Sequence, residues 1–542
     1  MRWKPDFTIP IMLIATVFFV ASLTPSLVPR GALVQGAVSG LSLAAAYAAG
    51  AFLRWIWLRM ELPQLRGRPL DLARTGVGAL CAVSVAVALY YASDWQNNLR
   101  ALLAMQPVQS GRPLVIVLVA VVVFLLLLWL GRLLLLVTTA LARWLARWLP
   151  GPQAMLAGVA LTALLFWNVG NGVIIRNVLA AMDASYARFD ALFEEASPQP
   201  TGALKTGGPE SLLSWEGLGR AGREVVARGP DRARIEEVAG GPAEEPLRIY
   251  VGLNSAPDPQ ARADLALAEL LRVGAFERGT LVIATPTGTG WLDPESQRAL
   301  EFLTRGDVAT VSVQYSYLAS WITLLVDPDY GVETARAVFS AVYGHWRTLP
   351  RETRPRLYLH GLSLGALNSD LSHDLFQVIE NPYDGALWAG PPYESPTWME
   401  VTRHRDAGSP AWLPVYRRGQ TVRFMNQNGE SEGADAPWGA FRILYLQYAS
   451  DAVTFFDPYS AWDRPDWMEK PRGPDVSPGM TWLPVVTLLQ LGVDMMTAVL
   501  PPLGYGHTYR FDHYVAAWAA LTGAPGWDEE GLERLKLAGA NG

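Results

Sequence analysis

Residues 358–365 read Tyr-Leu-His-Gly-Leu-Ser-Leu-Gly and contain a G-x-S-x-G motif centred on Ser363. The motif follows a short apolar run and precedes a segment of helical character, the context in which a serine occupies a sharp strand-to-helix turn. Gly361 and Gly365 are needed because a side chain at either position would collide with neighbouring backbone. The backbone N–H of Leu364, at the start of the helix, can then stabilise an oxyanion. The motif therefore predicts nucleophilic catalysis by Ser363.

A serine hydroxyl requires a histidine base, which in turn requires a carboxylate to orient it. Four histidines follow Ser363 along the chain. His507 lies in a glycine-rich loop after the last predicted strand and is the predicted base, with His513 as the alternative. His373 falls in the helix that leaves the motif and His404 precedes the last strands, so we interpret both as ordinary surface or cap residues.

The predicted acid is Asp451, which follows the predicted strand 442–447 after three residues. Its position suits a catalytic carboxylate because open α/β sheets place their sites at the carboxyl ends of the strands. Asp457 is close behind and is the alternative acid. A second oxyanion donor is predicted from the backbone of Leu253 or Asn254, at the end of the first strand of this region, although a plain strand-to-helix turn explains the same residues equally well.

Short β-rich runs alternate with helical patterns beyond residue 213, which predicts a mainly parallel sheet with helices on both faces. The order nucleophile, acid, histidine is the order of the α/β-hydrolase fold. Helices are predicted at 260–273 and 333–346. The predicted strands are 247–254, 280–285, 308–315, 356–359, 386–389, 422–425 and 442–447.

Several strings together resemble a family of bacterial membrane proteins that carry N-terminal helices and a C-terminal α/β-hydrolase region. They lie at residues 214–220, 285–291, 306–309, 314–317, 358–365, 446–451 and 506–509. The resemblance implies a serine hydrolase, and some relatives resemble enzymes that hydrolyse aminoacylated phosphatidylglycerol. Two positions depart from the pattern: Ala452 stands where proline is usual after the acid, and Tyr505 where a further histidine is frequent.

The first 180 residues are predicted to form a membrane domain, because a helix needs about 20 mainly apolar residues to cross a bilayer. Five predicted spans are 9–27, 31–53, 75–91, 114–130 and 155–175. Arg132 interrupts the end of the fourth, so residues 133–149 either prolong that helix or lie along the interface. The arginines of the loops after spans two and four place those loops in the cytoplasm. Five spans then place the hydrolase region on the outer face of a bacterial inner membrane, and four or six would reverse it.

Residues 196–210 are rich in proline, glycine and small polar residues, which is typical of a flexible connection. The predicted organisation is a transmembrane domain (1–180), a linker (181–213) and an α/β-hydrolase catalytic domain (214–542). The net charge of −6 without a long basic run excludes nucleic acid as the expected partner. The single cysteine, Cys81, excludes an intrachain disulfide framework and a cysteine-based zinc site. No metal or organic cofactor is required by the predicted mechanism.

Two segments bear on the substrate. Residues 398–418 combine arginines with aromatic side chains, as in a cap that recognises a phosphate headgroup, although a solvated loop with core-anchoring aromatics explains them equally well. Residues 482–503 are apolar and lie between Asp451 and His507. They are predicted to form a helix packed over the sheet or dipping into the outer leaflet.

These observations predict a membrane-bound esterase that acts on a lipid or lipid-linked ester, with the bilayer and a membrane lipid as its partners. The alternatives are a peptidase or amidase of the same fold, and a transporter or scaffold whose hydrolase-like domain only binds.

Overall fold

The structure is a computed structural model that describes residues 8–63, 67–168, 198–317 and 328–539. The chain divides into two compact units. The helical unit comprises Met1–Ala181, Asp457–Met468 and Pro474–Pro501, and the sheet-containing unit comprises Met182–Phe456, Glu469–Gly473 and Pro502–Gly542. The predicted division into 1–180 and 214–542 therefore needs one correction, because two segments from the C-terminal half belong to the helical unit.

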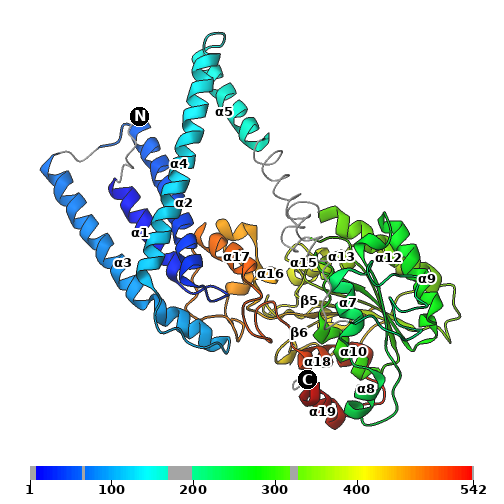
Figure 1. Ribbon diagram of the computed structural model, residues 1–542. Coiled ribbons are helices and arrows are strands. Elements are labelled where there is room, and N and C mark those ends of the chain that lie inside the picture. Colours follow the sequence, from blue (N-terminus) through cyan, green and yellow to red (C-terminus); the bar gives the residue numbers. More distant parts are fainter. Residues whose placement is uncertain (1–7, 64–66, 169–197, 318–327, 540–542) are drawn as a thin grey trace. The chain divides into compact units, whose positions relative to one another are not determined.

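Among the described residues, the N-terminal part of the helical unit contains five helices, each overlapping one of the five predicted spans (Figure 1). They are α1 (Ile9–Leu23), α2 (Ala32–Arg59), α3 (Arg68–Leu102), α4 (Pro113–Leu145) and α5 (Gly151–Trp167). Among the described residues, α2, α3 and α4 are long and apolar enough to cross a membrane, whereas α1 and α5 are apolar but shorter. Helix α4 continues through Arg132 to Leu145, and the predicted end of the fifth span lies outside the described residues. The helices are compatible with a membrane domain.

Helices α2 and α4 pack closely because α2 presents glycines to α4. A Cβ at Gly36 would lie 2.7 Å from the Cβ of Val119, and one at Gly40 would lie 2.7 Å from the carbonyl oxygen of Ala120. Small residues spaced by four allow two helix backbones to approach closely. Helices associate in this way in an apolar medium, where the hydrophobic effect does not favour their association.

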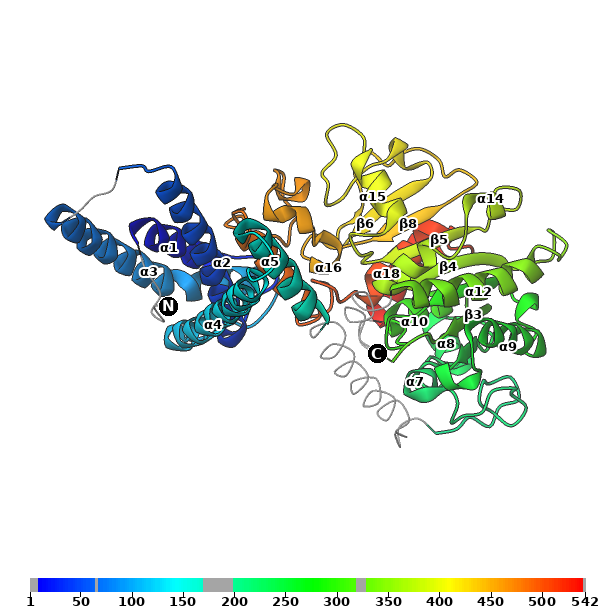
Figure 2. The same ribbon diagram turned by 90° about the horizontal axis from the view of Figure 1, so that it is seen from above.

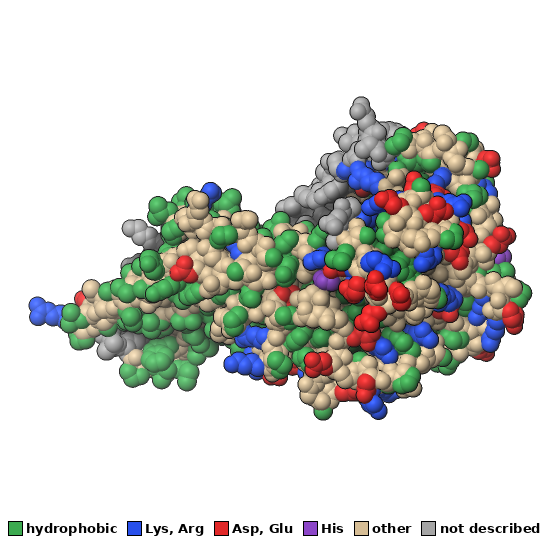
Figure 3. Space-filling view, turned by 90° about the horizontal axis from the view of Figure 1, so that it is seen from below, with side chains coloured by type: hydrophobic (Ala, Val, Ile, Leu, Met, Phe, Trp, Pro, Cys, Tyr) green, Lys and Arg blue, Asp and Glu red, His purple; other side chains and the backbone are tan. Residues whose placement is uncertain are grey.

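Large apolar side chains cover the outside of these helices. Leu80, Leu118, Leu126 and Leu156 are each at least 60% exposed. Figure 3 shows hydrophobic side chains gathered over the surface of this unit. A surface of this kind is unstable in water and stable against lipid, which supports membrane association.

The segment Pro474–Pro501 contributes a further helix to the helical unit. Helix α17 (Val486–Met496) contacts α1 and α2. Its Gln490 side chain donates to the carbonyls that end α1, and the Asp494 carboxylate accepts the backbone N–H groups of Leu27 and Val28. The expectation that 482–503 packs over the sheet was wrong, because its polar groups find their partners at the end of α1 and in the connection to α2. The alternative, that the helix dips into the outer leaflet, stays a prediction.

The sheet-containing unit is built on eight strands in the order β1-β3-β2-β4-β5-β8-β6-β7, all parallel except the β6–β7 pair. This arrangement confirms the predicted α/β-hydrolase fold class. The bounds of the strands are β1 (Leu247–Val251), β2 (Thr280–Thr285), β3 (Val308–Val313), β4 (Arg356–Leu362), β5 (Gly385–Ala389), β6 (Val422–Asn426), β7 (Gly429–Glu430) and β8 (Ile443–Leu446).

Helices cover both faces of this sheet (Figures 1 and 2). One layer contains α9 (Pro259–Arg272), α12 (Pro328–Trp346) and α13 (Leu364–Asp370), and the other contains α10 (Pro294–Leu303) and α18 (Phe511–Thr522). The remaining helices are α7 (Gly219–Ala227), α8 (Arg232–Ala239), α14 (Leu375–Val378), α15 (Pro396–Arg403), α16 (Ala452–Phe455) and α19 (Glu529–Gly539). Every residue of β1, β2, β3, β5 and β8 is buried, as expected for a parallel sheet enclosed by helices.

Candidate active site

Ser363 lies between β4 and α13 with φ 57° and ψ −128°, a backbone conformation that is strained for any residue except glycine. The two glycines of the motif make this turn possible. A Cβ at Gly361 would collide with the carbonyl of Gly365, and one at Gly365 would collide with the carbonyl of Thr285 on β2. The strand, the strained serine and the helix therefore form the sharp strand-to-helix turn that the motif predicted.

Asp451 and His507 come together although they are far apart in the sequence. His507 Nδ1 lies 2.7 Å from Asp451 Oδ2, and both side chains are buried. Asp451 caps α16, since its Oδ1 accepts the N–H of Val453 at 2.9 Å. The loop that carries His507 is held by the N–H of Gly506, which donates to Ser450 Oγ at 2.9 Å. The Nε2 atom of His507 has no hydrogen-bond partner among the described residues.

The end of β5 connects Ser363 with this pair. The N–H of Ser363 donates to the carbonyl of Ala389 at 3.0 Å. At the next residue, Gly390, a Cβ would lie 2.7 Å from His507 Cε1 and 2.9 Å from Asp451 Oδ2. Parallel strands β4, β5 and β8 end at the same edge, which brings the three residues to one place. Gly390 was not predicted from the sequence, where it is only a glycine after a strand.

Tyr509 was also missed as a partner of the acid. Its hydroxyl donates to Asp451 Oδ2 at 2.7 Å, and the side chain is 1% exposed. Burial and the Asp451 carboxylate raise the pKa of Tyr509 well above its usual range, so the phenol remains a donor. The string 506–509 pointed to this tyrosine, but the sequence offered no means of linking it to Asp451.

The predicted oxyanion donors Leu253 and Asn254 do not lie beside Ser363. They follow β1, which is separated from β4 by β3 and β2, a distance of roughly 14 Å at the usual strand spacing. The N–H of Leu253 is also directed at Gln314 Oε1, at 3.2 Å. A donor from these residues would require the first strand to neighbour β4, but the sheet places β2 there instead.

The loop at residues 286–291, which follows β2, borders the nucleophile turn. A Cβ at Gly365 would lie 3.0 Å from the carbonyl of Pro286. The loop is braced from β1 and β3, since the Tyr250 hydroxyl donates to the carbonyl of Gly290 at 2.7 Å and Gln314 Nε2 donates to the carbonyl of Thr289 at 3.3 Å. The end of β1 therefore supports a loop beside Ser363 instead of reaching Ser363 itself.

Comparison with known protein families gives two matches. Residues 247–535 match the Alpha/beta-hydrolase family, and residues 23–230 match the Alpha/beta-hydrolase family N-terminus. The chain belongs to the alpha/beta-hydrolase family. Both the helical and the sheet-containing part are covered, which agrees with the resemblance noted in the sequence. No curated protein and no solved structure matches this chain.

In this alpha/beta-hydrolase, the alternative base and acid occupy other places. His513 Nδ1 lies 2.6 Å from the Tyr448 hydroxyl, and burial lowers the pKa of His513 to about 4. His373 is held between Ser372 and the Tyr383 hydroxyl. Asp457 belongs to the helical unit and caps a short helix by accepting the N–H of Tyr459.

The aromatic and arginine-rich segment at 398–418 is largely occupied by internal contacts. Trp398 is buried and its Nε1 donates to Gln447 Oε1 at 2.7 Å, while Trp412 Nε1 donates to the carbonyl of Pro471 at 2.8 Å. Arg418 forms a two-pronged ion pair with Asp435. These contacts favour the interpretation of core-anchoring aromatics over a phosphate-binding cap.

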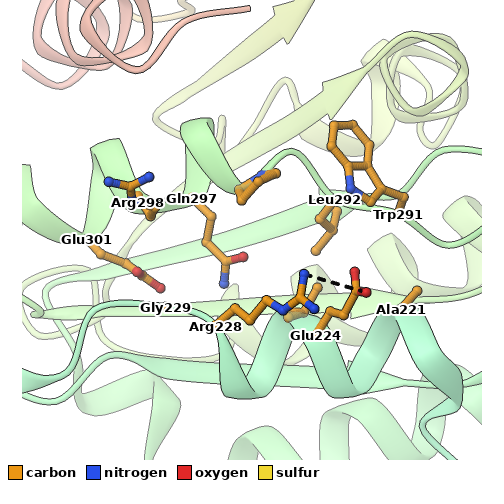
Figure 4. A pocket seen from close by; sticks show the side chains of 11 residues that line it. Ala221, Glu224, Arg228, Gly229, Trp291, Leu292, Gln297, Arg298 and Glu301 are labelled. Carbon is orange, nitrogen blue, oxygen red and sulfur yellow. Dashed lines mark ion pairs between the residues drawn. The ribbon is translucent and has the colours of Figure 1, made fainter. Parts of the chain in front are cut away.

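A small pocket of about 100 Å³ lies between α7 and α10 of the hydrolase (Figure 4). Arg228 and Glu224 form an ion pair on one wall, with Trp291 and Arg298 among the other lining residues. Ser363, Asp451 and His507 do not line this pocket, so it is separate from the candidate site.

Proposed function

We propose that this chain is a serine hydrolase that cleaves an ester through an acyl-serine intermediate, with Ser363 as nucleophile, His507 as base and Asp451 as the orienting acid. The observation that carries the proposal is the Asp451–His507 hydrogen bond together with His507 Nε2, which has no hydrogen-bond partner in the part of the chain that the structure describes. A neutral imidazole whose Nδ1–H points at a carboxylate presents a lone pair at Nε2, which is what a hydroxyl nucleophile requires.

The reaction follows from these positions. His507 Nε2 takes the proton of the Ser363 hydroxyl as Oγ forms a bond with the substrate carbonyl carbon, and the carbonyl oxygen becomes an oxyanion. The N–H of Leu364 at the start of α13 is one donor to that oxygen. The second donor is expected from the loop at 286–291. His507 then returns the proton to the leaving alcohol, and water releases the acyl group by the reverse sequence.

The substrate class is proposed to be a lipid or lipid-linked ester, because the chain also carries apolar helices suited to a membrane. Attachment to the bilayer holds the catalytic unit close to lipid esters and replaces a search through solution. Aminoacylated phosphatidylglycerol is one such ester, and it is suggested by the resemblance alone. The positive-inside pattern of the arginines supports an outward-facing catalytic unit.

The test is labelling by a fluorophosphonate probe, which reacts only with an activated serine. Wild type should be labelled, and Ser363→Ala, His507→Ala and Asp451→Ala should lose labelling, whereas Ser214→Ala, at an exposed serine of the same unit, should keep it. Absence of labelling of the wild-type protein in both intact and lysed cells would overturn the serine mechanism.

Two further comparisons address the substrate and the side of the membrane. Parallel assays with a p-nitrophenyl ester and a p-nitroanilide distinguish an esterase from an amidase. A membrane-impermeant probe should label Ser363 in intact cells, and labelling confined to lysed cells would reverse the proposed orientation.

A further inference from the structure

The helical unit contains a cavity of about 930 Å³ at the end where α2 and α4 begin. Its walls come from the turn between α1 and α2, the C-terminal part of α3 and the connection from α3 to α4. Three arginines line it, Arg30, Arg100 and Arg112, and the described lining residues include no aspartate or glutamate. A cavity with this lining favours an anion.

Buried polar groups in the wall lack partners within the described chain. Arg30 is 5% exposed; its Nη2 donates to the carbonyl of Thr24 at 3.2 Å, but its Nη1 has no hydrogen-bond partner. Gln96 is 8% exposed and its Oε1 accepts the N–H of Arg30 at 3.0 Å, while its Nε2 has no partner. A buried donor without a hydrogen-bond partner destabilises the fold, because it has lost its contact with water and gained nothing in exchange. A ligand that brings acceptors would relieve this cost.

An acidic side chain inside the protein balances the charge of Arg30, whereas the contacts of Arg100 and Arg112 described here are to neutral groups. Arg30 Nε lies 3.8 Å from Asp494 Oδ1, and both side chains are inaccessible to solvent. Arg100 Nη1 donates to the carbonyl of Gln106, which is a neutral partner. Arg112 is exposed and stands at the N-cap of α4. Arg100 and Arg112 therefore supply the excess positive charge of the cavity.

The first turns of two long helices add to this field. Gly31 caps α2 and Arg112 caps α4; within the described chain neither cap residue makes a side-chain hydrogen bond to its helix, and neither first turn contains an acid. Residues from both first turns line the cavity. The positive ends of the two helix dipoles attract the same kind of ligand as the arginines.

We propose that this cavity binds the phosphate of an anionic glycerophospholipid. Arg100 and Arg112 would hold the phosphate oxygens through charge-assisted hydrogen bonds, and the apolar wall, which includes Leu23, Leu33, Val115 and Ile116, would contact the glycerol and acyl carbons. A soluble phosphate leaves that wall without a partner. A zwitterionic lipid is disfavoured because its ammonium would meet arginines and no carboxylate. The site lies within the helical unit, and the proposal does not depend on the activity of Ser363.

The test is binding of dioleoylphosphatidylglycerol to the full-length chain in mild detergent, counted by native mass spectrometry, with dioleoylphosphatidylcholine as the neutral comparison. Wild type should retain one phosphatidylglycerol in preference to phosphatidylcholine. Arg100→Gln with Arg112→Gln should weaken that retention at least about tenfold, as expected for the loss of two charge-assisted contacts. Equal retention of the two lipids by wild type, or unchanged retention by the variant, would overturn the proposal.

Two variants keep the result interpretable. Arg147→Gln removes an exposed arginine from the connection between α4 and α5 and should leave lipid retention at the wild-type level. Arg112→Glu reverses the charge at an exposed position, so it should fold even if the double variant does not, and it should abolish the preference for phosphatidylglycerol. Fluorophosphonate labelling of each variant reports separately on the catalytic unit.

A last arm separates the two sources of phosphate. Inorganic phosphate and glycerol 1-phosphate, at millimolar concentration, should not displace the bound lipid, because they cannot use the apolar wall. Displacement by either compound, dependent on Arg112, would show a site for a soluble phosphate and would refute the lipid assignment.

Discussion

Asp293 allows a pH-dependent prediction. It caps α10, where its Oδ1 accepts the N–H of Glu295 at 3.0 Å, and its Oδ2 accepts the hydroxyl of Tyr514 at 2.9 Å. The side chain is 7% exposed, and burial raises the pKa of Asp293 to about 7. Asp293→Asn retains the shape of the side chain and an oxygen for the helix cap, but it cannot ionise.

The sign follows from proton binding in the two states. Folded Asp293 holds its proton up to about pH 7, whereas an unfolded aspartate loses it near pH 3.9. The wild-type protein therefore loses stability as the pH rises between these values, and the loss is complete above pH 7. The difference of about three pH units between the folded and unfolded pKa values of Asp293 corresponds to at most about 4 kcal/mol in the free energy of unfolding. We expect the Asn variant to gain about 1–3 kcal/mol over wild type between pH 4.5 and 8, since relaxation and a weaker cap reduce the full value.

The assay is denaturant unfolding of the full chain in detergent, followed by tryptophan fluorescence at pH 4.5, 6, 7 and 8. The control is Asp258→Asn, the same exchange at the exposed N-cap of α9, where Asp258 Oδ1 accepts the N–H of Ala261. A stability difference between Asp293→Asn and wild type that is constant across this range would refute the reasoning, because it would mean that burial does not hold the proton on Asp293.

Three other changes test the site and its supports. Ser363→Gly and Ser363→Ala should both lower the rate of ester hydrolysis more than about a thousandfold. The glycine variant should have a free energy of unfolding about 0.5–2 kcal/mol higher than the alanine variant, because glycine relieves the strained turn. Equal stability of the two variants would contradict this. Tyr509→Phe should lower the free energy of unfolding by about 1.5–3 kcal/mol and should change kcat more than KM, with Tyr505→Phe as the control. An unchanged kcat would show that Asp451 keeps its position without the Tyr509 hydroxyl. Asp494→Asn should destabilise the helical unit by about 2–4 kcal/mol in thermal unfolding, because Arg30 loses its only nearby carboxylate among the described residues; an unchanged melting temperature would count against a buried ion pair.

Much of the fold follows from local sequence. The strands 280–285 and 308–313 were predicted within two residues because short β-branched runs between turn residues suit a buried parallel sheet. The turn at Ser363 was predicted because glycine is the only residue that fits beside the backbone at 361 and 365. The apolar lengths of α2, α3 and α4 pointed to a membrane domain without knowledge of their packing.

The tertiary structure decided what depends on strand order and on distant partners. Leu253 and Asn254 were misplaced because no local pattern shows that β3 and β2 lie between β1, the first strand of the domain, and β4. Tyr509 and Gly390 gained a role only when β5, β8 and the His507 loop met at one edge.

The segment between Asp451 and His507 shows the same limit. Its apolar character was evident in the sequence, but its partners were not, since α17 joins α1 and α2 through Gln490 and Asp494. Periodicity and glycine sterics act over a few residues and can be recognised in the sequence alone. Which surfaces meet depends on the combined packing of many side chains, and this is why the site's supports and the cavity beside Arg30 emerged only from the folded chain.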